Sequence, residues 1–149
     1  MEKKLKCEKK IIIDAPVTKV WQALTTSDIV KEYFFGDEAI SSWNVGDSIT
    51  FKGEWEGQEY LGRGIILNRV PYKLFRFSYW SSLSGLENKS ENYLHLTYKL
   101  SEDDDSKTEL ITIVEKIPDE SMKVKIQRDM DKVLQSLKQI TETQIFEMA

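Results

Sequence analysis

Few side chains in this sequence could perform acid–base, nucleophilic or metal chemistry. His95 is the only histidine and Cys7 the only cysteine among the 149 residues. As a general base, His95 would need a carboxylate to position it, and Glu109 or Glu115 on the adjacent predicted strand could serve. We favour the simpler interpretation, a histidine that faces solvent from a strand. Zinc sites are built from clustered histidine and cysteine ligands, so one of each, far apart in the sequence, predicts no zinc site.

The other polar segments also lack catalytic or metal-binding spacing. Residues 102–105, Glu-Asp-Asp-Asp, miss the alternating acidic ligands, central glycine and terminal glutamate of a calcium-binding EF-hand loop. The serines of residues 81–90 have no base that the sequence identifies, so a serine nucleophile is unsupported. This longest irregular segment between strands is either the mouth of a cavity or an ordinary surface loop. We predict no catalytic residue, no bound metal and no cofactor.

Composition excludes several classes of protein. The net charge of -4 argues against a protein that binds nucleic acid through its phosphates. Hydrophobic residues make up 40% and charged residues 31%, the balance of an ordinary globular domain, so we expect a single domain over residues 1–149. No run approaches the roughly 18 apolar residues of a membrane-spanning helix, which predicts no membrane insertion. The lysine-rich start is not followed by an apolar secretion signal, so we expect a cytoplasmic location.

Hydrophobic periodicity predicts about seven strands and two short helices. Runs of β-branched or alternating residues predict strands at residues 3–14, 39–43, 48–55, 58–70, 73–80, 91–100 and 108–115. Asp14-Ala15-Pro16 can open a short helix directly after the first strand, and residues 25–28 can cap a second one that ends near residue 34. The later strands have connections short enough for hairpins, except at residues 81–90, so we predict an antiparallel meander.

A long amphipathic helix is predicted over residues 119–143. Its apolar residues recur at spacings of about three and four, which places them on one stripe. They are Met122, Ile126, Met130, Val133, Leu134, Leu137 and Ile140. This stripe must cover the sheet. The predicted fold class is therefore α+β, a curved antiparallel sheet of about six or seven strands against a long C-terminal helix, with two short helices after the first strand.

Residues 15–25, Ala-Pro-Val-Thr-Lys-Val-Trp-Gln-Ala-Leu-Thr, resemble the start of the first helix in the START-like (SRPBCC, Bet v 1-type) superfamily. Within it, the chain is similar to the activator-of-Hsp90-ATPase homologue (AHSA1) family at residues 45–47, at Gly64 followed by Pro71, and at residues 98–100 and 108–110. The resemblance covers nearly the whole chain. It implies the helix-grip fold, in which a curved sheet wraps around the long C-terminal helix.

The family resemblance also implies a varied set of activities. Members bind apolar small molecules, carry out cyclase or hydrolase chemistry in some branches, and stimulate a chaperone ATPase in two-domain eukaryotic proteins. Fold alone does not decide among these activities.

Strand alternation predicts which side chains of the sheet face the long helix. We expect inward aromatic residues, together with three residues of the helix, to line a cavity for an apolar or aromatic small molecule. The candidate ligand-binding residues are Phe51, Trp55, Tyr60, Phe77, Tyr79, Tyr98, Met130, Val133 and Leu137. The same side chains could instead form a plain core with tyrosine hydroxyls at its rim.

Two other functions stay open on the sequence alone. One is a co-chaperone-type module that docks on an Hsp90-like partner and stimulates its ATPase. The other, weaker one is a cyclase- or hydrolase-type enzyme. We favour a binding protein over an enzyme, because the catalytic inventory amounts to one histidine and scattered carboxylates. The partners to expect are an apolar or aromatic small molecule or a chaperone, and the chain itself is a monomer or a homodimer.

Overall fold

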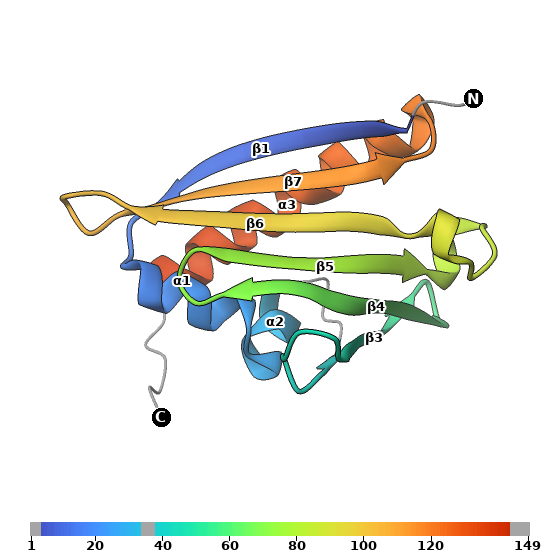
Figure 1. Cartoon of the computed structure of the whole chain (residues 1–149), viewed down its shortest axis with the longest axis horizontal. Helices are drawn as coiled ribbons and strands as arrows, with labels where there is room; N and C mark the ends of the chain where they lie inside the picture. The colour runs from blue at the N-terminus through green and yellow to red at the C-terminus, as the bar shows by residue number, and fades with distance from the viewer. Residues whose placement is uncertain (1–3, 34–37, 144–149) are drawn as a thin grey trace.

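The computed structural model describes residues 4–33 and 38–143, apart from the side chain of Trp55. Helices and strands follow one another in the order that the sequence predicts (Figure 1). They are β1 (Leu5–Ile13), α1 (Val17–Leu24), α2 (Ser27–Tyr33), β2 (Glu38–Ile40), β3 (Ser48–Trp55), β4 (Gln58–Val70), β5 (Leu74–Ser81), the 3-10 turns η1 (Ser82–Ser84) and η2 (Ser90–Asn92), β6 (Leu94–Glu102), β7 (Thr108–Ile117) and α3 (Glu120–Thr143).

The strands form one antiparallel sheet in the order β1-β7-β6-β5-β4-β3-β2. From β2 to β7, neighbours in the sheet are also neighbours in the sequence, and β1 completes the sheet beside β7. The predicted α+β class with its antiparallel meander and helix-grip arrangement is confirmed.

Two strand boundaries differ from the prediction by three residues, and the others differ by no more than two. β2 ends at Ile40 instead of residue 43, and Trp43 has a positive φ of 66°, a left-handed conformation outside the range of strands. β6 begins at Leu94 instead of residue 91, because the backbone N–H of Tyr93 closes a 3-10 turn on the carbonyl of Ser90. The end predicted for the second helix, near residue 34, lies outside the described residues.

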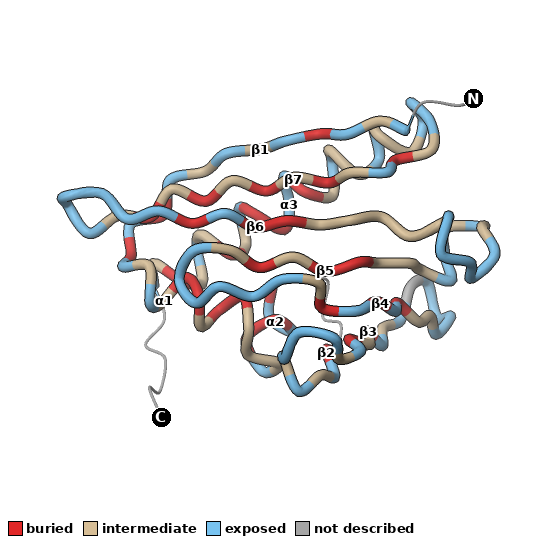
Figure 2. The backbone as a smooth tube through the Cα atoms, in the orientation of Figure 1, coloured by how far each residue is buried: buried red, intermediate tan, exposed pale blue. Residues whose placement is uncertain are grey.

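The helices cover one face of the sheet and leave the other face to solvent (Figure 1). α3 packs chiefly against β1, α2, α1 and β7, so α1 and α2 complete the cover over the far strands. Buried and more exposed residues alternate along the strands (Figure 2), most regularly in β7. This alternation is what a sheet with one packed face requires.

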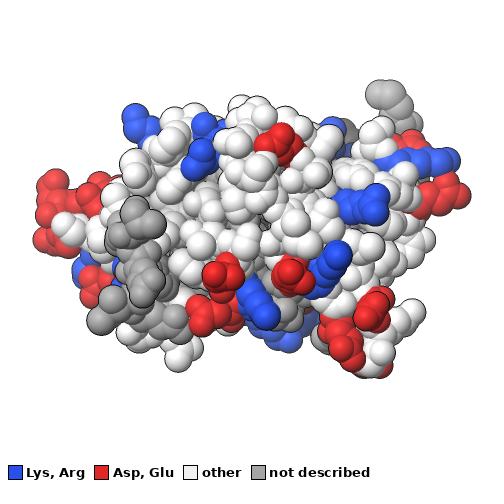
Figure 3. Space-filling view, turned by 90° about the horizontal axis from the view of Figure 1, so that it is seen from below, with Lys and Arg blue, Asp and Glu red and all other residues white. Residues whose placement is uncertain are grey.

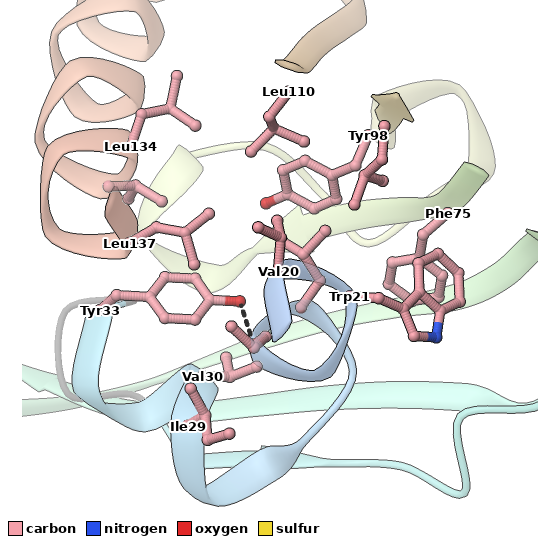
Figure 4. Packing of buried hydrophobic residues seen from close by; sticks show 14 of the residues in the cluster. Val20, Trp21, Ile29, Val30, Tyr33, Phe75, Tyr98, Leu110, Leu134 and Leu137 are labelled. Carbon is pink, nitrogen blue, oxygen red and sulfur yellow. Dashed lines mark hydrogen bonds between the residues drawn. The ribbon is translucent and has the colours of Figure 1, made fainter. Parts of the chain in front are cut away.

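The buried core has two parts. The larger part joins inward residues of the sheet to α1, α2 and the C-terminal half of α3, and Figure 4 shows its centre. The smaller part consists of Cys7, Val114, Ile117 and Met130, under the N-terminal half of α3. Leu96 is half-buried and packs against both parts, so it marks the seam between them.

Side chains from distant segments hold the start of α1. Pro16 precedes the helix and offers no side-chain cap, but the carboxylate of Glu102 accepts a hydrogen bond from the Val17 backbone N–H at 2.9 Å. The buried hydroxyl of Thr108 donates to the carbonyl of Ala15 at 2.8 Å. Strands β6 and β7 therefore supply the partners that the local sequence around the turn lacks.

On the face that Figure 3 shows, basic and acidic side chains are interspersed around a largely uncharged middle. None of the described helices is both long and apolar enough to cross a membrane.

Candidate ligand-binding site

An aromatic row crosses the inward face of the sheet. Phe51 lies 5.5 Å from Tyr79 and 6.1 Å from Phe77, and Phe77 lies 6.3 Å from Tyr98, measured between ring centroids. These tilted and edge-on contacts are the arrangements that aromatic pairs prefer. Four of the residues predicted for the site are thus brought together, from β3, β5 and β6.

Glycines in β4 make room for this row. A Cβ atom on Gly62 would lie 2.7 Å from the ring of Tyr79, so this ring occupies space that a side chain would take. A Cβ atom on Gly64 would lie 1.6 Å from the backbone carbonyl oxygen of Ser78. Both positions therefore require glycine for close approach, one to a site residue and one to the neighbouring strand.

The three residues predicted on α3 divide between the two parts of the core. Val133 and Leu137 belong to the larger part with Phe51 and Phe77, and Leu137 is fully buried. Met130 belongs to the smaller part, where its sulfur lies 3.4 Å from the thiol of Cys7. All three pack against other side chains.

The two remaining predicted residues lie toward the β3–β4 hairpin. Tyr60 is half-buried and pairs with Gly53 across these strands. The side chain of Trp55 lies outside what the structure describes.

The deep end of the aromatic row is closely packed. A void of about 10 Å³ lies between β3, β5, β6 and α2, which is room for at most one water molecule. Burial raises the pKa of Tyr98 to about 12 and that of Tyr33 well above its ordinary value. The Tyr33 hydroxyl donates to the carbonyl of Ala23 (Figure 4). At neutral pH these hydroxyls stay protonated and serve as hydrogen-bonding groups.

A larger cavity opens at the other end of the row, and we call it the mouth cavity. It has a volume of about 50 Å³, and its apolar wall is formed by Tyr79, Leu86, Leu94, Pro118 and Met122. Tyr79 packs against the larger part of the core, whereas Leu94 and Met122 pack against the smaller part. The mouth cavity therefore lies at the seam between the two.

The segment after β5, which the sequence suggested as a possible cavity mouth, contributes Ser84 and Leu86 to this lining. The Trp80 indole N–H donates to the Leu86 carbonyl at 3.1 Å and ties the segment to the strand end.

Leu86, Leu94 and Met122 line the mouth cavity but were not among the candidate residues predicted from the sequence. Alternation placed Leu94 on the inward face and the helix stripe contained Met122. Their place in the sequence was the only available indication. Leu94 begins β6, Met122 lies in the first turn of α3 and Leu86 follows η1 closely, so each lies near the end of an element, where cover from neighbouring elements stops.

His95 lies on the opposite, outward face of the sheet, as predicted, but it is half-buried. Its Nδ1 lies 2.8 Å from the guanidinium of Arg76, which can only donate, so Nδ1 accepts and the proton resides on Nε2. Burial lowers the pKa of His95, and the positive charges of Lys116 and Arg76 lower it further, against an opposing contribution from Glu115. Glu115 is its cross-strand neighbour.

His95 is not among the residues that line the mouth cavity. Among the described residues, no group of three or more His, Cys, Asp or Glu side chains could hold a metal ion.

Comparison with known proteins decides the family. The model of the family described as Activator of Hsp90 ATPase homolog 1-like protein (AHSA1) matches residues 14–142. The chain belongs to the AHSA1 family. The predicted family is thereby confirmed over residues 14–142, which run from the turn after β1 to the end of α3.

Several solved structures have a similar fold. ChR145 from Cytophaga hutchinsonii is 33% identical, with a TM-score of 0.81 over 95% of this chain and 97% of that one. The Aha1 dimer from Colwellia psychrerythraea is 20% identical, with a TM-score of 0.74 over 93% and 97% of the two chains.

DynU16, from the dynemicin biosynthetic locus, is 17% identical, with a TM-score of 0.75 over 93% of this AHSA1 chain and 47% of its own. Among curated proteins, none matches the chain.

Proposed function

We propose that this AHSA1 protein binds an apolar or aromatic small molecule between the sheet and α3, at the mouth cavity. The observation that carries the proposal is the divided core. At the seam, inward-facing apolar side chains that should be buried stay half-exposed, namely Tyr79, Leu94, Leu96, Met122 and Ile126. A ligand that filled the seam would remove their apolar surface from water and join the two parts of the core.

The same region carries an uncompensated polar group. The hydroxyl of Thr112 is buried and has no hydrogen-bond partner among the described residues. Thr112 lies on the inward face of β7 between Leu110 of the larger part and Val114 of the smaller part. A mostly apolar space with isolated polar groups is the usual composition of a small-molecule site.

The size of the mouth cavity specifies how binding would occur. At about 50 Å³ it has room for a few water molecules, far less than the roughly 300 Å³ of a typical ligand pocket. Binding therefore requires side chains to move aside. Met122 has three rotatable bonds and adapts readily, and Leu86 belongs to a segment of short turns at the surface.

The proposal is tested with N-phenyl-1-naphthylamine, an uncharged aromatic probe whose fluorescence rises in apolar surroundings. Wild-type protein should bind it, and a ligand at about 100 times its dissociation constant should raise the free energy of unfolding by about 2.7 kcal/mol. Met122→Trp fills the mouth cavity and should weaken binding about tenfold or more. Val124→Trp adds the same ring at an exposed position of α3 and should leave binding unchanged.

The proposal is wrong if neither this probe nor a panel of apolar and aromatic compounds binds to or stabilises the wild-type protein. The proposed location of the site is wrong if both tryptophan variants bind the probe as the wild type does, once circular dichroism has shown that they are folded.

A second candidate is docking on a chaperone. The family description names an activator of the Hsp90 ATPase, and the outward face of the sheet bears exposed Ile40, Ile65 and Val70, which a protein partner could cover. Purified Hsp90-type ATPase should then hydrolyse ATP faster when this protein is added, and Ile65→Lys should abolish the effect while leaving probe binding intact. An unchanged ATPase rate would exclude this candidate.

A further inference from the structure

Residues with polar side chains also line the mouth cavity. They are Lys4, Ser81, Ser84, Glu91 and Lys116. Two of them are lysines and one is a glutamate, so the lining residues carry a net positive charge, although the whole chain has a net charge of -4.

Neither of these lysines is neutralised by a fixed partner. Within residues 4–33 and 38–143, no ion pair involves Lys4 or Lys116. In the segment after β5, an ion pair joins Lys89 to Glu87, and neither of these residues belongs to the cavity lining. Among the described residues, neither lysine therefore has an ion-pair partner that an incoming anion would have to displace.

The hydroxyl groups of Ser81 and Ser84 are further hydrogen-bond donors that could bind an anion. Ser81 Oγ accepts from the Leu83 backbone N–H at 3.1 Å, and Ser84 Oγ accepts from the Leu86 backbone N–H at 3.2 Å. These contacts use oxygen lone pairs and leave each hydroxyl hydrogen free to donate. Among the described residues, neither hydroxyl donates a hydrogen bond.

An irregularity of β7 places Lys116 in the cavity lining. Leu5 pairs with Ile117 and Cys7 pairs with Val114, so two residues of β7, Glu115 and Lys116, lie opposite the single residue between Leu5 and Cys7. Lys116 has φ of 65°, in the left-handed region that bulges usually fill with glycine. A side chain kept in this unfavourable conformation is a reason to look for a role of that side chain.

We propose that the ligand of the mouth cavity is an anion: an apolar or aromatic body that carries one carboxylate or sulfonate group. This inference rests on the proposed function. The body lies against Tyr79, Leu94 and Met122, and Lys116 and Lys4 bind the anionic group. Glu91, in the same lining, disfavours ligands with several negative charges.

A pair of probes tests this assignment. 8-Anilinonaphthalene-1-sulfonate has the ring system of N-phenyl-1-naphthylamine with one added sulfonate, so the difference in affinity between the two reports on the charge. Wild-type protein should bind the sulfonate at least about tenfold more tightly, and added salt should reduce this preference. Lys116→Met should weaken sulfonate binding about tenfold and change binding of the uncharged probe less than about twofold. Lys4→Met should act in the same direction.

Two further variants control for folding and for surface charge. Lys116→Gly removes the ammonium group but suits the left-handed backbone, so it should lose the preference even if Lys116→Met disturbs the bulge. Lys99→Met removes an exposed lysine from the outward face and should leave both affinities unchanged.

The outcomes separate the two proposals. The proposal of an anionic ligand is refuted if the uncharged probe binds but the sulfonate binds no better, or if neither Lys116 variant alters the preference. In that case the proposed binding of an apolar molecule in the mouth cavity is retained. If neither probe binds, the proposed function itself fails.

Discussion

Two threonines on β7 offer a test of the packing by identical substitutions with opposite results. Thr108 and Thr112 both face inward, with exposed fractions of 0% and 3%. Thr108 donates to the carbonyl of Ala15, whereas Thr112 has no hydrogen-bond partner among the described residues. Threonine and valine have nearly the same shape, so Thr→Val removes the hydroxyl and leaves the packing in place.

The expected magnitudes follow from these partners. In Thr108→Val the buried carbonyl of Ala15 loses its donor, which costs about 1–3 kcal/mol and is partly offset by the added methyl group. We expect a net destabilisation of about 1–2 kcal/mol. In Thr112→Val an unpaired buried hydroxyl disappears, and we expect a stabilisation of about 1 kcal/mol.

Urea unfolding followed by circular dichroism measures both variants against the wild type. The two free energies of unfolding should differ by about 2–3 kcal/mol. Because 1 kcal/mol corresponds to about 2–4 °C at this chain length, Tm should fall for Thr108→Val and rise for Thr112→Val. The slope of the unfolding free energy with urea should stay unchanged, since the exposed surface is the same.

A loss of stability in Thr112→Val as large as that in Thr108→Val would refute the reasoning. It would mean that the Thr112 hydroxyl is satisfied in solution, by a buried water for example, and the seam would then be hydrated. Equal, near-zero effects would show that the Thr108 contact does not hold the turn before α1.

Three further outcomes are expected. Gly64→Ala should destabilise by about 3 kcal/mol, seen in urea unfolding, because its Cβ would collide with the Ser78 carbonyl; wild-type stability would contradict the register of β4 and β5. The folded state lowers the pKa of His95, so the unfolded chain takes up the proton more readily and stability should fall as pH drops below about 6.5; His95→Gln should lack this fall. Glu142 has its pKa lowered chiefly by a hydrogen bond from Lys138, so its contribution is present above about pH 4.5 and is lost in more acidic solution; Glu142→Gln should flatten that acid limb, and an unchanged limb would argue against the contact.

Much of the fold could be predicted from the sequence because its signals are local. Alternation in β5 separates Phe75 and Phe77 from Arg76, and the burial of these residues follows it. The stripe on α3 likewise predicted Val133 and Leu137 as buried. A hydrophobic period of two residues in a strand, or of 3.6 residues in a helix, can be recognised without knowing which element packs against that segment.

The features that the sequence did not reveal depend on contacts between distant segments. The carboxylate of Glu102 caps a helix that begins 85 residues earlier, and no local pattern announces this pairing. The bulge at Lys116 was also missed, because left-handed bulge positions are recognised by glycine, and this one is a lysine. The proposed site involves such a feature, since the bulge carries Lys116, a residue of the cavity lining.

The aromatic row and the mouth cavity explain why site residues were harder to assign than core residues. Phe51 and Tyr79 share a face and a contact, so periodicity treats them alike, yet the first is buried and the second is half-buried. The difference arises because α3 packs chiefly against β1, α2, α1 and β7, so cover at the β5 end is left to the short segment around Leu86. Where cover is a short segment instead of a helix, a small movement opens the space beneath it. The site should therefore be sought at the end of the aromatic row, where packing between elements stops, and not at its centre.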